Sequence, residues 1–284
     1  MVFTEKLRTR YIEFKALLRL LPLLPQISPK STYTPSKYVS KHSVEKPNAI
    51  ALRFLDKTWS WSQFDEEISR AALAYVSIGV KRGDKVVLLI DNRPEFLICM
   101  LALSRLQAVA VLLNTSVVGK SLAHCINVSK AGLITVGAEH VDKITAILSD
   151  LNQITAAEVW ELNDPYEQSA SSAEVSYNDF DDLLSSVDIT CAESLIDDGK
   201  TSIMDECCYI YTSGTTGLPK AAIVTNQRLT AMGIFFGRYM VDMKPTETMY
   251  ASSPLYHTMG LNCGFGSVLV LGATLALRRH FSAT

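Results

Sequence analysis

The sequence has none of the cysteine patterns that mark a zinc site or a disulfide framework. Its six cysteines include no C-x-x-C pair, and most of them lie in apolar runs. They are Cys99, Cys125, Cys191, Cys207, Cys208 and Cys263. Cysteine behaves as a small buried hydrophobe where no such pattern is present. We therefore expect free thiols in a reducing compartment and no metal site.

Long apolar runs are also absent. The longest run, residues 16–25, is interrupted by Arg19 and by two prolines, whereas a helix that spans a bilayer needs roughly 20 apolar residues. No small-residue cleavage site follows the run, as a secretory signal would require. Neither a spanning helix nor a secretory signal is predicted.

An excess of positive charge is missing as well. The formal net charge is −2, so the chain has no basic footprint for nucleic acid. Hydrophobic residues make up 48% and charged residues 20% of the sequence, which are values typical of globular proteins. A chain of 284 residues is long enough for one large domain or two. The composition predicts a globular protein that does not bind nucleic acid.

The charges that are present are unevenly distributed. Residues 1–30 contain six bases and two acids, a net charge of +4, whereas residues 150–206 hold fifteen carboxylates and one base, Lys200. The acidic stretch has no EF-hand spacing. A solvated acidic face therefore explains it better than a metal site.

The basic amino-terminal stretch has the periodicity of an amphipathic helix over residues 3–24. Its apolar residues recur at steps of three and four with bases between them; they are Tyr11, Phe14, Leu17, Leu18 and Leu21. The helix is expected to end at Pro22 or Pro25. Two interpretations remain open, a helix that lies in a membrane interface and a helix that packs on the globular body.

Farther along the chain, strand and helix patterns alternate. Residues 50–61 alternate around Asp56 and Lys57, which indicates a β-hairpin, and Ser62 is expected to cap the next helix, which stops at Gly79. Strands are predicted at 86–90, 109–113 and 133–136, and helices at 93–106 and 121–129. This alternation predicts a parallel sheet covered by helices on both faces.

The second half of the chain continues with shorter elements. The sequence predicts a strand near Val159, a helix at 178–186, a helix from Thr225 or Asn226 to about 239, and strands at 248–251 and 275–277. Arg278, Arg279 and His280 are expected to close the chain in a polar turn.

The stretch around which the chain is organised is residues 209–225, YIYTSGTTGLPKAAIVT. It sets hydroxyls and glycines between two short apolar runs; the hydroxyls belong to Thr212, Ser213, Thr215 and Thr216. Gly214 and Gly217 allow a positive φ and bring N–H groups close to an anion, and Lys220 adds a positive charge. The spacing is not that of a Walker A loop, which needs four residues between its glycines. The pattern predicts a phosphate-binding loop between two strands, with a plain polar hairpin loop as the alternative.

A run of this length and order resembles the signature loop of adenylate-forming enzymes, the acyl-CoA synthetase and luciferase superfamily, where it holds the β- and γ-phosphates of ATP. Three further segments, WSWSQFDEEISRAA, LIDNRPEFLICMLALSRLQAVAVLLNTS and SLAHCINVSKAGLITVGAEH, resemble the amino-terminal part of the fatty acid transport proteins, also called very-long-chain acyl-CoA synthetases. The resemblance extends from about residue 49 to residue 284, with a gap in the acidic middle. Val117 and Val118 depart from the usual Leu-Arg in one turn.

The resemblance implies site residues. Thr212 and Lys220 would act in catalysis, and the nucleotide would contact Tyr211, Thr212, Ser213, Gly214, Thr215, Thr216, Gly217 and Lys220. The segment SSPLYHTMGLNCGFG resembles the motif that lines the acyl pocket, so that His257 would border the carboxylate, Tyr256 the acyl tunnel, and Gly260 the substrate. An ordinary turn whose His caps a helix is the alternative. The helix after it is expected to face the acyl tail through Met259, Leu261, Phe265 and Val268.

The fold implied is α/β, the amino-terminal part of the adenylate-forming fold, with mostly parallel sheets covered by helices and truncated before the small carboxy-terminal domain. We expect an amphipathic helix at 1–30, a first α/β subdomain with the acidic connecting region at 31–204, and the start of a second subdomain at 205–284.

The activity implied is ATP-dependent conversion of long- or very-long-chain fatty acids to acyl-CoA through an acyl-adenylate, coupled to fatty acid uptake, with ATP, Mg²⁺ and coenzyme A taking part. The ribose-binding Asp, the Mg²⁺-binding Glu and the second Lys of the family lie downstream of Thr284, so this chain is expected to be an inactive fragment. A truncated, non-catalytic, membrane-associated lipid-handling protein and a ligase for another carboxylate are the alternatives. The expected location is a membrane surface of the endoplasmic reticulum, peroxisome or plasma membrane, with the catalytic part facing the cytosol.

Overall fold

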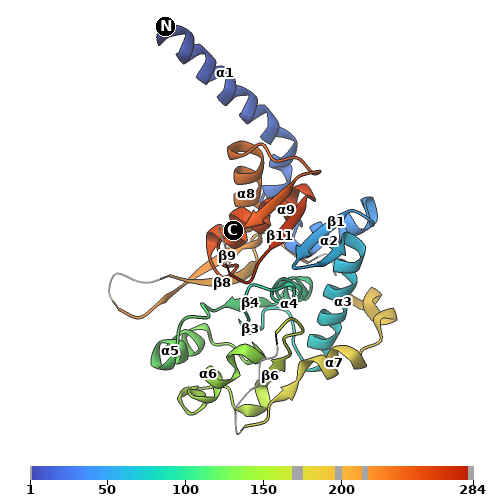
Figure 1. The fold of residues 1–284 in the computed structure, drawn as a ribbon, viewed down its shortest axis with the longest axis vertical. Coiled ribbons are helices and arrows are strands. Elements are labelled where there is room, and N and C mark those ends of the chain that lie inside the picture. Colours follow the sequence, from blue (N-terminus) through green and yellow to red (C-terminus); the bar gives the residue numbers. More distant parts are fainter. Residues whose placement is uncertain (1, 168–174, 196–199, 213–216, 281–284) are drawn as a thin grey trace.

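The computed structural model describes residues 2–167, 175–195, 200–212 and 217–280, and two β-sheets form its framework (Figure 1). The larger sheet has seven strands in the order β7-β6-β5-β3-β4-β8-β9, and the smaller has four in the order β10-β11-β1-β2. The strands are β1 (Ile50–Phe54), β2 (Lys57–Ser60), β3 (Lys85–Leu89), β4 (Val109–Leu112), β5 (Leu133–Gly137), β6 (Val159–Leu162), β7 (Asn178–Asp179), β8 (Glu206–Thr212), β9 (Lys220–Thr225), β10 (Thr248–Ala251) and β11 (Thr274–Leu277).

Helices of several types connect these strands. The α-helices are α1 (Val2–Leu20), α2 (Pro35–Glu45), α3 (Trp61–Ser77), α4 (Pro94–Arg105), α5 (Gly119–Ser129), α6 (Val141–Thr145), α7 (Phe180–Ser186), α8 (Asn226–Ile234) and α9 (Gly266–Leu271). The shorter 3-10 segments are η1 (Leu21–Ile27), η2 (Ala138–His140), η3 (Leu148–Asp150), η4 (Ala156–Glu158) and η5 (Ile189–Leu195), and two π-helical segments are η6 (Phe235–Met240) and η7 (Met259–Phe265).

The larger sheet is parallel except for the β8–β9 pair, and helices cover both of its faces. Successive residues of β3 point to opposite sides, so Val86 and Leu88 join a core with α3 and α4, while Val87 and Leu89 join a second core with α5 and α6. A strand buried on both faces needs a continuous apolar run, as these residues provide. The predicted α/β class with mostly parallel sheets is confirmed.

The smaller sheet joins distant parts of the chain. β1 and β2 form the predicted hairpin. β1 also pairs in parallel with β11, and in this register Leu52 lies opposite Leu275. Helix α3 then begins with a capping box in which the Ser60 hydroxyl accepts from the N–H of Gln63 and the Gln63 side chain accepts from the N–H of Ser60. The predicted cap at Ser62 was therefore wrong by one half-turn. Ser60 takes this role because the capping box satisfies two free N–H groups at once.

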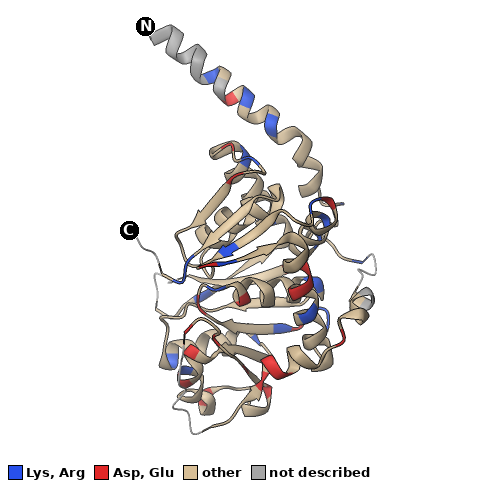
Figure 2. Ribbon diagram, turned by 45° about the vertical axis from the view of Figure 1, so that its right-hand side comes forward, with Lys and Arg blue, Asp and Glu red and all other residues tan. Residues whose placement is uncertain are grey.

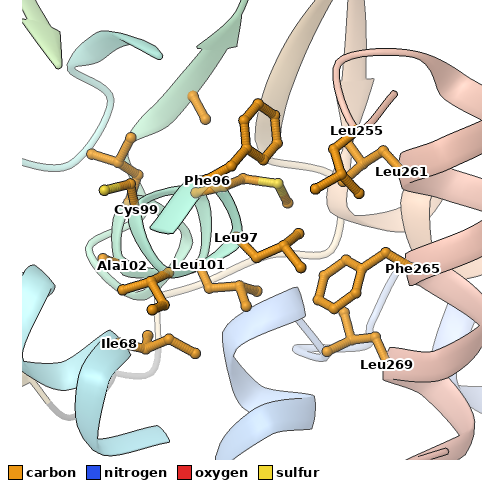
Figure 3. Close-up of a cluster of buried hydrophobic side chains, with 14 of the residues drawn as sticks. Ile68, Phe96, Leu97, Cys99, Leu101, Ala102, Leu255, Leu261, Phe265 and Leu269 are labelled. Carbon is orange, nitrogen blue, oxygen red and sulfur yellow. The ribbon is translucent and has the colours of Figure 1, made fainter. Parts of the chain in front are cut away.

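The helix that was expected to face an acyl tail packs instead in the protein core. Leu261, Phe265 and Val268 are all buried, and Figure 3 shows Phe265 and Leu269 lying against Leu97 and Leu101 of α4. Of the four predicted residues, only Met259 is exposed. The prediction is therefore corrected, because the contact with α4 uses the apolar face that was assigned to the substrate.

Two helices differ in kind from what periodicity predicts. The helix expected up to residue 239 is α-helical only to Ile234 and continues as the π-helical segment η6, and a second π-helical segment, η7, precedes α9. Gly233 of α8 lies so close to α9 that a Cβ there would be 2.4 Å from the carbonyl oxygen of Gly266. These two helices therefore pack with their backbones almost in contact.

Helix α1 projects away from the two sheets, and only its last turns lie beside η1 and η6 (Figure 1). The predicted amino-terminal helix is confirmed, although its α-helical part ends at Leu20 and Pro22 and Pro25 lie in the 3-10 segment η1. Within the described part of the chain, no helix has the length and apolar character needed to cross a membrane.

Candidate functional site

The predicted phosphate loop lies at the tip of the β8–β9 hairpin. In the antiparallel register Thr212, the last residue of β8, is opposite Lys220, the first residue of β9. The adjoining residues Cys207, Cys208 and Ile210 of β8 are buried, so the sheet fixes the base of the loop. Ser213, Gly214, Thr215 and Thr216 lie outside the described residues. Because β8 runs parallel to β4, the loop follows the carboxyl end of a strand, where open α/β sheets bind ligands.

The described residues of this loop differ in what they offer to a ligand. Thr212 and Lys220 are both exposed, and their side chains are available to an anion. Gly217 has a φ of +122°, in the region that favours glycine. Tyr211 is buried, and its hydroxyl donates to the carbonyl oxygen of Cys125 at 2.6 Å. Burial raises the pKa of Tyr211, so this neutral side chain anchors the loop from below.

A small cavity of about 100 Å³ adjoins the loop. Its walls are Leu113, Asn114, Val117, Leu122, Cys125, Tyr211, Thr212 and Pro219. Burial raises the pKa of the Cys125 thiol to about 11, so this cysteine is protonated at neutral pH and is a poor nucleophile. The cavity therefore joins the loop to the turn after β4 without adding a reactive group.

The predicted substrate motif follows β10. The N–H of His257 donates to the carbonyl oxygen of Pro254 at 3.0 Å, and the carbonyl of His257 accepts from Leu261 at 2.9 Å, which forms a tight turn into η7. A Cβ at residue 260 would lie 2.3 Å from the Pro254 oxygen, so only glycine fits there. The ring of His257 is exposed and that of Tyr256 half-buried, with their centroids 4.7 Å apart. The turn thus presents both rings at its surface.

A second cavity, of about 240 Å³, lies between the carboxyl ends of strands from the two sheets. It is lined by Asp91, Asn92, Thr115, Ser116, Ser252, Pro254, Tyr256, Arg279 and His280. The turn after β4 contributes to both cavities, Asn114 to the first and Thr115 to the second. Thr212 and Pro219, beside the predicted phosphate loop, and Pro254 and Tyr256 of the predicted substrate motif therefore line two cavities that share the turn after β4.

Three residues directly after β3 hold this region together. The side-chain oxygen of Asn92 accepts from the N–H of Leu255 at 2.9 Å, a buried bond between the larger sheet and the substrate motif. Asp91 accepts from Nε2 of His140 at 2.8 Å and pairs with Arg279 at 3.4 Å. Burial raises the pKa of Asp91, but the bond to His140 and the charge of Arg279 outweigh it, so the pKa lies below its usual value.

Arg93 completes the group from within the protein. Its guanidinium is fully buried, pairs with Glu95 at 3.0 Å and Glu139 at 3.3 Å, and donates to the carbonyl oxygen of Leu162 at 3.2 Å. Burial alone would lower the pKa of Arg93, and the two carboxylates raise it. The guanidinium therefore stays charged.

Among the described residues, Asp91, Glu139 and His140 place their ligand atoms within 4.8 Å of one another, the spacing that a metal ion requires. Two of the three are already neutralised, Asp91 by Arg279 and Glu139 by Arg93. A cation here would meet two guanidinium groups at close range, so the donor set does not fit a metal site. We assign no metal ligands to it.

The family model for "AMP-binding enzyme" matches residues 39–284. The chain belongs to the AMP-binding enzyme family. Among curated relatives, this AMP-binding chain is 29% identical over 249 residues to long-chain fatty acid transport protein 6 of Mus musculus, covering 87% of the chain and 38% of that relative. It is 31% identical over 244 residues to long-chain fatty acid transport protein 2 of Rattus norvegicus, and the match covers 84% of this chain and 37% of that relative.

A bacterial relative carries an explicit activity in its name. The medium/long-chain-fatty-acid–CoA ligase FadD6 of Mycobacterium tuberculosis is 28% identical over 235 residues, covering 83% of the AMP-binding chain and 36% of that ligase. The chain therefore spans less than two fifths of the length of these three relatives.

Solved structures confirm the fold of the AMP-binding chain. The anthranilate CoA ligase AuaEII in complex with anthranoyl-AMP superposes with a TM-score of 0.77 at 20% identity, covering 87% of the chain and 45% of the ligase. The long-chain-fatty-acid-CoA ligase FadD1 of Archaeoglobus fulgidus superposes with a TM-score of 0.72 at 17% identity, and the match covers 88% of this chain and 48% of FadD1. The chain therefore has the amino-terminal portion of the adenylate-forming fold.

Sequence reasoning found the hairpin and the substrate turn of this AMP-binding chain but missed the charged group between them. Arg279 was expected in a polar turn, and Asp164 in a solvated acidic face. Their side chains are 8% and 0% exposed and lie 2.5 Å apart. The expectation of a solvated side chain is corrected for Asp164, which is buried because a distant arginine pairs with it; the polar bend at residues 279–280 is present, but the Arg279 side chain points into the protein. The available signal was Asp91-Asn92-Arg93, three polar residues directly after a fully apolar strand of a parallel sheet.

Proposed function

We propose that the protein to which this chain belongs converts long- or very-long-chain fatty acids to acyl-CoA through an acyl-adenylate, in step with fatty acid uptake. The observation that carries the proposal is the β8–β9 hairpin, which holds Thr212 opposite Lys220 at the carboxyl end of β8. The names of the relatives, fatty acid transport proteins and a fatty-acid–CoA ligase, support the substrate class.

The chemistry consists of two displacements. A carboxylate oxygen attacks the α-phosphorus of ATP and pyrophosphate leaves; the thiolate of coenzyme A then attacks the acyl carbon and AMP leaves. Thr212 and Lys220 are proposed to hold the leaving phosphates, because hydroxyl and ammonium groups stabilise charge that develops on phosphate oxygens. Mg²⁺, when it is bound, would supply further positive charge to the leaving phosphates, and we assign none of the described residues as its ligands. The nucleotide contacts of Ser213, Gly214, Thr215, Thr216 and Gly217 belong to the same proposal.

The acyl group is proposed to enter beside the substrate turn. The exposed ring of His257 would border the carboxylate, and Tyr256, which lines the 240 Å³ cavity, would border the acyl chain. Gly260 keeps the turn closed, since a Cβ there would meet the Pro254 carbonyl. The helix after the turn, which was expected to face the acyl tail, is not part of this proposal, because its residues Leu261, Phe265 and Val268 are buried in the core.

This chain alone is proposed to be inactive, because it spans only 36 to 38% of the three relatives. Loss of one preorganised electrostatic contact costs about 2.7 to 4 kcal/mol of transition-state stabilisation, and a chain of this span lacks several.

We also propose that the chain is divided as the sequence predicts, into an amino-terminal helix at 1–30, a first subdomain at 31–204 and the start of a second subdomain at 205–284. Limited proteolysis that cuts near residues 30 and 204 before other sites would support them.

The activity is tested by pyrophosphate release with a very-long-chain fatty acid, using this chain and a longer product of the same transcript. We expect turnover only in the longer product, and a loss of roughly 100-fold or more in Lys220→Ala. Lys120→Ala, which removes an equally exposed lysine of α5, is the matched control and should keep full activity. Equal turnover by the two lengths, or an active Lys220→Ala, would contradict the assignment.

The same assay separates the alternatives. A longer product that turns over benzoate or another short carboxylate but no fatty acid identifies a ligase for a different acid. If no longer product exists and the short chain binds lipid without turnover, a non-catalytic lipid-handling protein is the better description. For the location we propose a membrane surface, that of the endoplasmic reticulum, peroxisome or plasma membrane, with the catalytic part in the cytosol, as the relatives' transport names suggest.

A further inference from the structure

Helix α1 and the first residue of η1 carry a row of large apolar side chains that nothing in the described structure covers. Their exposed fractions lie between 47 and 59%; the residues are Tyr11, Phe14, Leu17, Leu18 and Leu21. They recur at steps of three and four, so they share one face of the helix. A contiguous exposed apolar strip of this kind marks an interaction surface more often than scattered single residues do.

This row is not what holds α1 to the body. Ala16 is the buried residue of the described part of the helix, and Leu20, half-buried, packs on the main core. At 100° per residue Ala16 and Leu20 lie on the side of the helix away from Tyr11, Phe14 and Leu18. The apolar row therefore faces away from the protein while a different side attaches the helix.

Bases flank the apolar row. Arg10 and Lys15 are exposed, and the Lys15 ammonium lies 4.5 Å from the centre of the Tyr11 ring. Figure 2 shows bases along the projecting helix, and residues 10–20 of the helix contain a single acid, Glu13. Long basic side chains beside an apolar strip are typical of helices that lie in a lipid interface.

The π-helical segment η6, together with Val241 at its end, lies beside the last turns of α1 and exposes apolar side chains of its own. Phe235, Met240 and Val241 expose 46, 59 and 49% of their surface. At this junction Asp242 pairs with three bases, Arg19 at 3.0 Å, Lys244 at 2.7 Å and Arg238 at 3.5 Å. One carboxylate cannot neutralise three bases, so the junction keeps a positive charge.

We propose that these two elements form one docking surface for a bilayer with anionic headgroups. This α1–η6 surface consists of Tyr11, Phe14, Leu17, Leu18, Leu21, Phe235, Met240 and Val241. Charge decides the occupant: five bases (Arg10, Lys15, Arg19, Arg238 and Lys244) accompany three acids, Glu13, Asp242 and Glu247, which leaves an excess of positive charge. Anionic lipid complements this excess while accepting the apolar side chains, whereas a second copy of the surface would bring like charges together.

The proposal deepens, and rests on, the membrane location proposed above, and it adds a structural consequence. η6 continues α8, which packs backbone to backbone on α9 at Gly233 and Gly266. α9 in turn continues η7, the helix that begins at the substrate turn. A bilayer bound at η6 thus lies against helices that are rigidly joined to His257 and Tyr256.

The test is flotation of the full chain with vesicles of phosphatidylcholine and phosphatidylserine, at low and high salt and without ATP. We expect binding at low salt, loss at high salt, and little binding to phosphatidylcholine alone. Arg10→Gln with Lys15→Gln should weaken vesicle binding about 30-fold, since each base near an anionic surface strengthens binding roughly fivefold. Lys120→Gln with Arg228→Gln removes the same charge from exposed positions on α5 and α8 and should bind as the parent does.

The apolar residues have their own matched pair. Phe14→Gln with Leu18→Gln, and separately Met240→Gln with Val241→Gln, should each weaken binding about tenfold or more, because each variant removes two insertable side chains. Val44→Gln with Val128→Gln changes two residues outside the surface that are at least as exposed as Leu18 and should have no effect. Gln is a good helix former, so α1 persists in these variants, and far-ultraviolet circular dichroism checks that it does.

Three outcomes would overturn the proposal. In the first, binding does not depend on salt or on phosphatidylserine. In the second, the control pairs weaken binding as much as the test pairs. In the third, sedimentation without vesicles shows dimers that Phe14→Gln with Leu18→Gln abolishes, so that the surface pairs two copies. None of these readouts depends on catalysis. The docking surface can therefore fail its test while the proposed ligase activity, which the pyrophosphate assay measures, still holds.

Discussion

His42 shows how much a single buried side chain depends on its charge state. It lies on α2 with 4% of its surface exposed, between the rings of Tyr38 and Trp61. Its Nε2 bonds to the carbonyl oxygen of Leu269 at 2.8 Å, while Nδ1 has no hydrogen-bond partner among the described residues. Burial lowers the pKa of His42 to about 4, more than the bond to Leu269 raises it. The folded protein therefore holds this imidazole neutral.

The low pKa of His42 predicts a loss of stability on mild acidification. Between the unfolded pKa near 6.5 and the folded pKa of about 4, the unfolded chain binds a proton that the folded chain does not. Stability is therefore complete above 6.5 and falls as the pH falls toward 4. His42→Gln keeps a donor for Leu269 but cannot titrate. Between pH 7 and 5, we expect its free energy of unfolding to change by about 2 kcal/mol less than that of the parent. Parallel pH profiles in denaturant titrations would refute this.

At this scale the sequence predicts only residues that lie in a recognisable run. Thr212, Lys220 and His257 were found because the order of their neighbours is distinctive, and their roles in binding stay predictions. Arg279 and Asp164 were missed because burial of a charged side chain depends on a partner 115 positions away. No local pattern specifies such a pair.

The elements were predicted best where the apolar pattern is strong. The central strands β3 and β4 of the larger sheet are nearly continuous apolar runs, and the β1–β2 hairpin alternates around its turn, so each pattern indicates one structure. The π-helical segments η6 and η7 were not predicted, because stretches of 6 and 7 residues are too short to show an apolar period of their own. Gly237 of η6, however, lies against α9, where a Cβ would be 2.9 Å from the Cβ of Ser267.

The contact between α8 and α9 predicts a strong effect of a single methyl group. In Gly233→Ala, the new Cβ would lie 2.4 Å from the Gly266 carbonyl oxygen, and both partners are backbone, so the helices must separate. We expect a loss of about 1 to 3 kcal/mol in the free energy of unfolding, even though Ala favours a helix by about 1 kcal/mol over Gly. Gly132→Ala is the control, because its Cβ would meet open space. If both variants unfold at the same denaturant concentration, the close packing of α8 on α9 is wrong.

The whole molecule depends on contacts that local sequence cannot specify. β1 pairs with β11, so residues near 52 lie beside residues near 275, and hydrophobic periodicity states that a strand exists but not which strand it joins. The parallel larger sheet was predicted because alternating strands and helices permit few other arrangements. The smaller sheet, in which β1 from early in the chain pairs with β11 from its last part, was not predicted. Its position bears on the proposed function, because it places the predicted substrate turn near the turn after β4, which the base of the predicted phosphate loop also adjoins.

Arg279 joins the two sheets and carries the last prediction. It follows β11 of the smaller sheet and pairs with Asp91 and Asp164, which follow β3 and β6 of the larger sheet. Burial would lower the pKa of Arg279, but Asp164 and its neighbours raise it, so the charge persists in the interior. Removal of one partner leaves the other buried and uncompensated, which costs about 3 to 5 kcal/mol in such pairs.

We therefore expect Arg279→Met to lose about 3 to 5 kcal/mol in the free energy of unfolding, measured by denaturant titration. Arg278→Met, at the exposed neighbouring position, removes the same charge and should stay within about 0.5 kcal/mol of the parent. Adding Asp164→Asn to Arg279→Met removes the stranded carboxylate and should restore a large part of the loss, because the cost arises from the unpaired charge and not from the missing side chain. If Arg278→Met and Arg279→Met are equally stable, the sheets are not joined through Arg279. If Asp164→Asn restores nothing, the pairing partner is wrong, since a buried carboxylate without its arginine is the state that the second change relieves.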